Sequence, residues 1–215
     1  MNKENRPNLT VQSLKRMPYY LQYLKDAKAK GIQILSATSI ANALKLNDVQ
    51  VRKDISAICT TKGKPKSGFI VEELIANIED YLGYNNKMDA VLVGVGSLGK
   101  ALLSNREFDK YGLNIVAAFD VDEDIIDQII CGKQVFPLEK LEKLCERMSI
   151  PIGIITVPAE FAQSVCDKLV HSGIRAIWNF TLIRLDVPDT VLIRSENLAA
   201  SLAVLSQHLR EESDE

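Results

Sequence analysis

The sequence predicts an α/β protein: an N-terminal winged-helix domain, then a Rossmann-like parallel-sheet domain and a C-terminal helix. Two observations lead to this fold class. A glycine-rich turn at residues 94–99 lies between an apolar run and an amphipathic stretch, and such segments alternate up to about residue 194. This alternation is typical of βαβ units in a parallel sheet. We therefore expect domains at residues 1–86, 87–194 and 195–215.

Charge is unevenly distributed along the chain. The net charge of the 215 residues is −2, but residues 1–86 contain 13 Lys and Arg against 8 Asp and Glu. A basic N-terminal domain favours a polyanionic partner, although a solvated basic surface gives the same count. No apolar run approaches the roughly 18 residues of a membrane span, and residues 1–7 are polar. We therefore expect a cytoplasmic protein without membrane contact.

The cysteines and histidines indicate neither a metal site nor a disulfide framework. The chain has two histidines and four cysteines, and no two cysteines form a C-x-x-C pair. Isolated cysteines are typically small buried apolar residues. We expect this of Cys59, Cys131, Cys145 and Cys166.

The first domain contains a helix-turn-helix pattern. Residues 10–29 have apolar side chains at helical spacing. Two shorter helices follow: Ser39–Leu44, and a second that Asn47 or Asp48 caps and that ends near Ile58. A tight pair of short helices of this kind is a common means of placing one helix in the major groove of DNA.

The polar side of the second short helix suits contact with bases. It carries Gln50, Arg52 and Lys53, and Arg and Gln are the side chains that bind guanine and adenine edges. A lysine-rich loop follows at residues 60–69, and such a wing suits phosphate contacts. The alternative is an exposed helical pair with solvated lysines. The predicted DNA-binding residues are Gln50, Arg52, Lys53, Lys62, Lys64 and Lys66.

The glycine-rich turn predicts a dinucleotide site. Its spacing is G-x-G-x-x-G, from Gly94 to Gly99, between the apolar run Ala90–Val93 and a helix expected at 100–108. The glycines permit a tight turn, close approach of a pyrophosphate and close packing of helix on strand. Asp120 ends the next strand, at the distance where an acid binds a ribose diol. The alternative is a structural βαβ turn without a ligand.

Other strand tips are expected to complete the site. Ligands of open parallel sheets bind outside the carboxyl ends of the strands. Two later buried strands end near Thr156 and near Trp178, so their tips should converge with the glycine turn. The predicted nucleotide-binding residues are Gly94, Val95, Gly96, Ser97, Leu98, Gly99, Asp120, Val121, Thr156, Val157, Pro158, Asn179 and Phe180.

The C-terminal segment predicts an amphipathic helix over Glu196–Arg210. Its leucines form one stripe, which covers either this chain's own sheet or a second copy in a homodimer. The stripe consists of Leu198, Leu202, Leu205 and Leu209.

The residues favour a sensor over an enzyme. Hydride transfer needs an acid or base beside the nicotinamide. His171 lies at a helix end and His208 near the C-terminus, so neither is at a strand tip. A small NAD-dependent oxidoreductase stays open as an alternative, and so does a DNA-binding regulator of another nucleotide, such as a CoA derivative.

The sequence resembles the Rex family of bacterial redox-sensing transcriptional repressors. The resemblance covers nearly the whole chain and rests on motifs in order. They are V-R-K-D-I-S at 51–56, V-G-x-G-x-L-G-x-A-L within 92–102, F-D-V-D at 119–122, T-V-P at 156–158 with Ala162-Gln163, Gly173-Ile174 and I-W-N-F at 177–180.

The resemblance implies a mechanism. It implies a homodimer that exchanges C-terminal helices, binds a palindromic operator and releases it when NADH binds, with NAD+ competing. Arg52 and Lys53 would contact the operator. The glycine turn, Asp120, Thr156–Pro158 and Asn179–Phe180 would line the nucleotide site. NADH and NAD+ would then be regulatory ligands.

The chain departs from the family pattern at several positions. Gln22 and Asn197 replace the arginine and aspartate of an intersubunit ion pair, Asn105 replaces a tyrosine, and Leu198 replaces a phenylalanine. The wing also has fewer glycines than the family shows. A paralogue with altered ligand preference or a weak redox response is therefore a further alternative.

Overall fold

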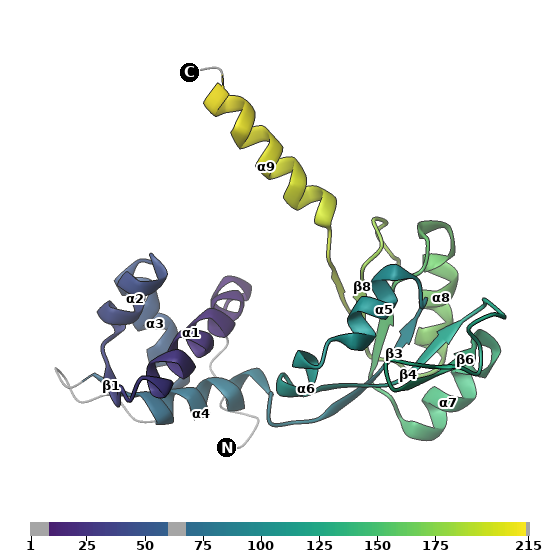
Figure 1. Ribbon diagram of the computed structural model, residues 1–215, viewed down its shortest axis with the longest axis horizontal. Helices are drawn as coiled ribbons and strands as arrows, with labels where there is room; N and C mark the ends of the chain where they lie inside the picture. The colour runs from purple at the N-terminus through teal and green to yellow at the C-terminus, as the bar shows by residue number, and fades with distance from the viewer. Residues whose placement is uncertain (1–8, 60–67, 214–215) are drawn as a thin grey trace. The chain divides into compact units, whose positions relative to one another are not determined.

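In the computed structural model of the protein, residues 9–59 and 68–213 are described (Figure 1). Contacts divide the chain into two compact units, Met1–Asn86 and Lys87–Glu215. The first unit contains α1 (Val11–Ala29), β1 (Ile34–Leu35), α2 (Ala37–Leu44), α3 (Asp48–Ile58), β2 (Phe69–Ile70) and α4 (Val71–Leu82).

Side-chain caps define the helix-turn-helix of the first unit. Ser36 Oγ accepts a hydrogen bond from the Ser39 amide at 2.9 Å, so α2 begins two residues earlier than predicted. Asn47 Oδ1 accepts from the amides of Val49 and Gln50 at the start of α3, as predicted. β1 pairs antiparallel with β2, and Phe69 of β2 packs against the apolar core of this unit.

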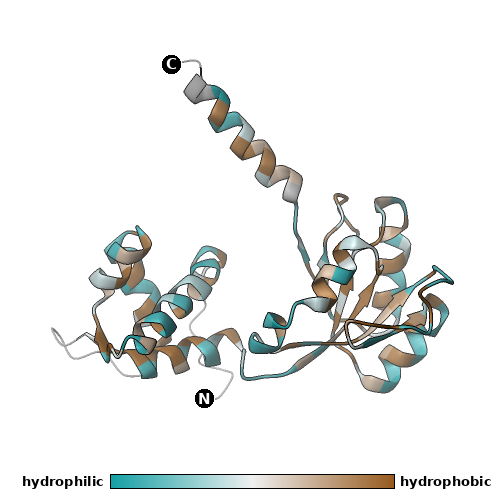
Figure 2. Cartoon of the chain, in the orientation of Figure 1, coloured by the Kyte–Doolittle hydropathy of each residue, from teal (hydrophilic) through white to brown (hydrophobic). Residues whose placement is uncertain are grey.

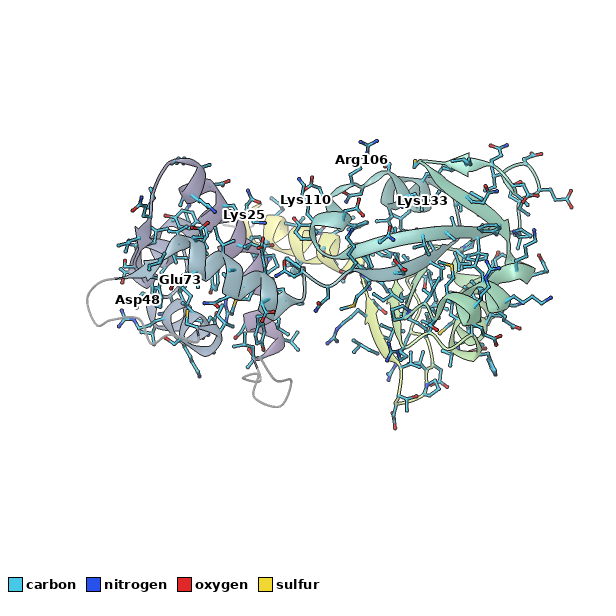
Figure 3. The ribbon with its side chains drawn as sticks, turned by 90° about the horizontal axis from the view of Figure 1, so that it is seen from below. Lys25, Asp48, Glu73, Arg106, Lys110 and Lys133 are labelled. Carbon is cyan, nitrogen blue, oxygen red and sulfur yellow. The ribbon has the colours of Figure 1, made fainter. Side chains whose placement is uncertain are left out.

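The first unit has its own apolar core. Helices α1, α2, α3 and α4 each bury one side, and the largest fully buried side chains there are Met17, Tyr20, Leu24, Ile40, Ile55, Leu74 and Ile78. At the surface, Lys25 of α1, labelled in Figure 3, lies 2.7 Å from a carboxylate oxygen of Glu79 on α4.

The second unit is a doubly wound sheet. Its strands are β3 (Met88–Val93), β4 (Leu113–Asp120), β5 (Ile129–Ile130), β6 (Lys133–Pro137), β7 (Ile152–Ile155), β8 (Ala176–Asn179) and β9 (Leu192–Ser195). They lie in the order β5-β6-β4-β3-β7-β8-β9, and all pairs except β5–β6 are parallel. This is the Rossmann order, with its switch point between β3 and β7.

Helices cover both faces of this sheet. They are α5 (Ser97–Ser104), α6 (Glu107–Lys110), the 3₁₀ turn η2 (Leu138–Lys140), α7 (Leu141–Met148) and α8 (Ala159–His171). The last helix, α9 (Leu198–Ser213), does not pack on the sheet, and its residues 199–210 are exposed. Val91 and Val93 pack with α7 and α8, whereas Ala90 and Leu92 pack with α5. Figure 2 shows the resulting brown, hydrophobic strands beneath helices with teal outer sides. Among the described helices, none has the length and hydropathy of a membrane span.

Several local predictions were wrong. The helix expected at 100–108 is two helices, because Asn105 is extended, and its Oδ1 accepts a hydrogen bond from the Glu107 amide at the start of α6 at 3.0 Å. We expected the last strand at Thr190–Ile193, but β9 spans Leu192–Ser195. Cys145 and Cys166 are buried as predicted, but Cys59 is half-buried and Cys131 is exposed.

Candidate functional site

The glycine loop joins β3 to α5 through two close backbone approaches. Gly94 has φ +97°, and a Cβ there would lie 2.8 Å from the carbonyl carbon of Thr156. A Cβ on Gly99 would collide with the carbonyl oxygen of Gly94. The first position therefore requires glycine for the turn, and the second requires it for packing of α5 on the loop.

The backbone between these two glycines is open. A Cβ on Gly96 would meet no atom within 4 Å, so a ligand has room to approach the chain there. Gly96 is also the N-cap of α5, and it supplies no side chain to bond the first amides of the helix. Free amides and the positive end of the helix dipole attract an anion to this point.

Asp120 fastens the tip of β4 to the glycine loop. Its Oδ2 accepts a hydrogen bond from the Val95 amide at 2.5 Å, and its Oδ1 accepts from the amides of Val121 and Asp122 at 2.7 and 3.1 Å. These bonds fill both lone pairs of Oδ1 and one of Oδ2. One acceptor position on Oδ2 is therefore left for a ribose hydroxyl.

The tip of β7 adjoins the glycine loop on its other side. Thr156 Oγ1 lies 2.6 Å from the carbonyl oxygen of Gly94, and the Thr156 amide donates to the carbonyl of Val93 at 2.9 Å. The tips of β3 and β7 are thus joined at the switch point. This is where ligands of such sheets bind.

A cavity of about 750 Å³ lies at these tips, which is within the usual size range of ligand sites. Ten of the predicted residues line it, namely Gly94, Val95, Gly96, Leu98, Asp120, Val121, Thr156, Val157, Pro158 and Phe180. Most of the wall is apolar, and the ionisable side chains on it are Lys100, Asp120 and Asp122.

Ser97, Gly99 and Asn179 do not line this cavity. Asn179 is fully buried, and its side chain makes four hydrogen bonds. Its Nδ2 donates to the Ile183 carbonyl and to Ser195 Oγ, and its Oδ1 accepts from the amide and hydroxyl of Thr181. The Asn179 side chain therefore holds the tip of β8 in place, and the predicted contact of this residue with the nucleotide stays a prediction.

Sequence reasoning missed part of the cavity wall. Phe161, Ser164 and Val165 of α8 line it, and their helical spacing after the Thr-Val-Pro tip could have predicted this. Leu138, Ile125 and Lys100 also line it. Lys100 lies one turn into α5, and no charged partner of its ammonium is found among the residues that the structure describes.

Helix α3 presents two predicted DNA-binding side chains to solvent. Lys53 is exposed, and the Arg52 side chain is 62% exposed. Arg52 lies 3.4 Å from the carboxylate of Asp48, which Figure 3 labels at the start of α3. Gln50 is half-buried instead, and its Nε2 donates to Asp54 at 2.9 Å. The predicted wing residues Lys62, Lys64 and Lys66 lie outside the described residues.

The residues that depart from the family pattern make local contacts. Gln22 Nε2 donates to Asp26 one turn along α1 at 3.0 Å. Asn197 Oδ1 accepts from the Ala200 amide at 2.9 Å and so caps α9.

These features define a class of protein: a regulator in which a helix-turn-helix unit precedes a Rossmann unit with a nucleotide-sized cavity. Two family models match the chain accordingly. The model described as "CoA binding domain" matches residues 85–183, and that described as "Putative DNA-binding protein N-terminus" matches residues 9–56.

Curated relatives and solved structures give the family. The redox-sensing transcriptional repressor Rex of Treponema denticola is 42% identical, over 90% of this chain and 91% of its own. The Rex repressor of Porphyromonas gingivalis is 39% identical, over 92% of this chain and 90% of its own. The crystal structure of RSP in complex with beta-NAD+ and operator DNA has a TM-score of 0.90 at 31% identity, over 96% of this chain and 94% of that chain. The crystal structure of RSP in complex with beta-NADH has a TM-score of 0.85 at 31% identity, over 95% of this chain and 96% of that chain. The chain belongs to the Rex family of redox-sensing transcriptional repressors.

Proposed function

We propose that this chain is a DNA-binding transcriptional repressor that senses NADH/NAD+, and that NADH binding releases operator DNA. The observation that carries this proposal is the pairing of a nucleotide-sized cavity at the β3–β7 switch point with an exposed Arg52-Lys53 pair on α3. Family membership agrees with it, since RSP has been crystallised both with NADH and with NAD+ and operator DNA.

The cavity suggests how a dinucleotide lies. Its pyrophosphate would rest on the open backbone at Gly96 and the first amides of α5. The free acceptor position of Asp120 would take an adenosine ribose hydroxyl, and the nicotinamide half would extend toward Thr156 and Phe180. Asp120 and Asp122 would repel a 2′-phosphate, so we expect NAD(H) to bind more tightly than NADP(H).

The DNA contact follows from α3. Arg52 and Lys53 would enter the major groove, with the lysines of the wing on phosphates. Two copies of α3 related by a dimer axis would read a palindromic operator. The nucleotide acts by binding the DNA-releasing form of the dimer more tightly than the DNA-bound form.

We infer that α9 is the dimerisation element, within residues 195–215. Three leucines of its stripe, Leu202, Leu205 and Leu209, are 63%, 63% and 64% exposed in the single chain. An apolar stripe this exposed would be buried by contact with a second copy of the chain. Like its relatives, which are named repressors, the chain would act without catalysis, and in the cytoplasm.

A second ligand class has one observation in its favour, because the family model over residues 85–183 is described as a CoA binding domain. The test is to titrate NADH, NAD+, NADPH and acetyl-CoA into the complex of the protein with a palindromic duplex that it selects from a random pool. The proposal requires NADH to release the duplex at the lowest concentration. Release by acetyl-CoA alone would contradict it and support the alternative.

A further inference from the structure

A buried polar cluster connects α1 to α3 in the first unit. It consists of Ser13, Arg16 and Tyr20 on α1 and Gln50 and Asp54 on α3. Tyr20 is 0% exposed, Asp54 1% and Ser13 4%. None of these residues lines the nucleotide cavity, so nucleotide binding does not account for the cluster.

Asp54 is the centre of the cluster. Its Oδ2 accepts from Arg16 Nε at 2.8 Å and from the Tyr20 hydroxyl at 2.9 Å. Its Oδ1 accepts from Arg16 Nη2 at 3.2 Å and from Gln50 Nε2 at 2.9 Å. Both lone pairs of each oxygen are therefore used, and the two-point contact of Arg16 fixes the plane of the carboxylate.

The cluster keeps its charges at neutral pH. Burial acts to raise the pKa of Asp54, but hydrogen bonds from Arg16, Gln50, Tyr20 and Ser13 outweigh burial and lower it. Burial, and then the hydrogen bond to Asp54, raise the pKa of Tyr20 to about 12. The hydrogen bond to Asp54 raises the pKa of Arg16. An ionised carboxylate, an ionised guanidinium and a neutral phenol therefore lie together at the α1–α3 interface.

A cluster of this kind contributes little net stability, but it fixes the rotation of one helix against the other. Well-packed apolar side chains of similar volume often stabilise a protein as much as a buried ion pair, or more. The apolar core of this unit, which includes Met17, Val51 and Ile55, has no strong directional preference. If α3 rotated about its axis by one residue position, about 100°, Arg52 would point away from the major groove of a bound duplex.

We propose that Asp54 is a positioning residue for DNA reading. The cluster fixes the rotation of α3 against α1, and this fixed rotation presents Arg52 and Lys53 to the bases. Gln50, predicted from sequence to read DNA, belongs to the cluster through its Nε2. The inference rests on the proposed role of α3 in DNA binding, and it concerns sequence discrimination more than stability.

The test replaces the cluster with apolar side chains of similar size, in the triple variant Arg16→Met, Tyr20→Phe, Asp54→Leu. The matched control is Lys25→Met, Glu79→Leu, which removes the α1–α4 ion pair and leaves α3 untouched. Affinities are measured for two duplexes, the palindrome that the wild type selects from a random pool and a shuffled sequence. Thermal unfolding and NADH binding are measured on the same proteins.

We expect the ratio of the two affinities to fall about tenfold or more in the triple variant, equivalent to losing discrimination at one base pair. Affinity for the shuffled duplex, NADH affinity and Tm should change little, and the control should keep the full ratio. An unchanged ratio in a folded triple variant would overturn the inference. If the triple variant does not fold, Tyr20→Phe removes one donor only, and it should still lower the ratio by roughly two- to fivefold; an unchanged ratio there would also overturn it. Unchanged operator binding by Arg52→Ala would instead refute the DNA-reading role of α3.

Discussion

Replacing Asp120 with alanine tests the nucleotide site at its most specific contact. The change removes the acceptor that we assign to the ribose, and a hydrogen bond to a charged group contributes about 1.5–3 kcal/mol. We therefore expect NADH to bind roughly 10- to 150-fold more weakly. The change also leaves the Val95 amide without its partner, and since Val95 is 1% exposed this loss is about 1–3 kcal/mol of stability. The second unit should melt several degrees lower.

The assay is calorimetric titration of NADH well below the lowered Tm, so that the variant is folded. Asp124→Ala is the matched control, because Asp124 is an exposed carboxylate on the same loop that does not line the cavity. It should bind NADH like the wild type. NADH affinity within about twofold of wild type in a folded Asp120→Ala protein would refute the ribose assignment.

Arg52→Ala and Lys53→Ala should each weaken operator binding by about 1–3 kcal/mol in gel shifts without changing NADH affinity, and full operator affinity would contradict the assignment of α3. Gly99→Ala should abolish NADH binding, because its methyl group collides with the Gly94 carbonyl; calorimetry showing normal binding would refute that geometry. The pKa of the Asp54 carboxyl is lowered in the folded protein, so its ionised form stabilises the fold at pH values above the ordinary aspartate pKa of about 3.9. This stabilisation is lost as the pH falls through the pKa of Asp54 in the folded state. Urea unfolding at several pH values should therefore show that the free energy of unfolding falls more steeply with decreasing pH in the wild type than in the triple variant.

The sequence predicted the elements whose causes are local. The glycine loop needs particular residues at fixed spacing, and the Asn47 cap lies within a few residues of the amides that it bonds. Alternation of apolar strands with amphipathic helices predicted a Rossmann-like parallel sheet, and the structure supplies the order of its strands. The tips of β3, β4 and β7 then converge because parallel strands place their carboxyl ends at one edge.

Contacts between distant segments could not be predicted in this way. Asn179 looked like a ligand contact because it ends a strand, but its side chain is used by Thr181, Ile183 and Ser195, which only the folded loop brings together. Asp54 was part of the V-R-K-D-I-S motif at 51–56, and no role of its own was predicted for it from the sequence. Its partners Arg16 and Tyr20 are more than thirty residues away, so its burial was not visible in the local pattern.

Nucleotide occupancy and operator release can be followed together in one sample. Trp178 is the single tryptophan of the chain, and its ring lies 4.8 Å from that of Phe180 on the cavity wall. Energy transfer from Trp178 should therefore report bound NADH, while anisotropy of a labelled palindromic duplex reports release. We predict that NADH releases the duplex over the same concentration range in which it quenches Trp178, and that NAD+ delays both changes. Full quenching with the duplex still bound would contradict the claim that the cavity controls DNA binding.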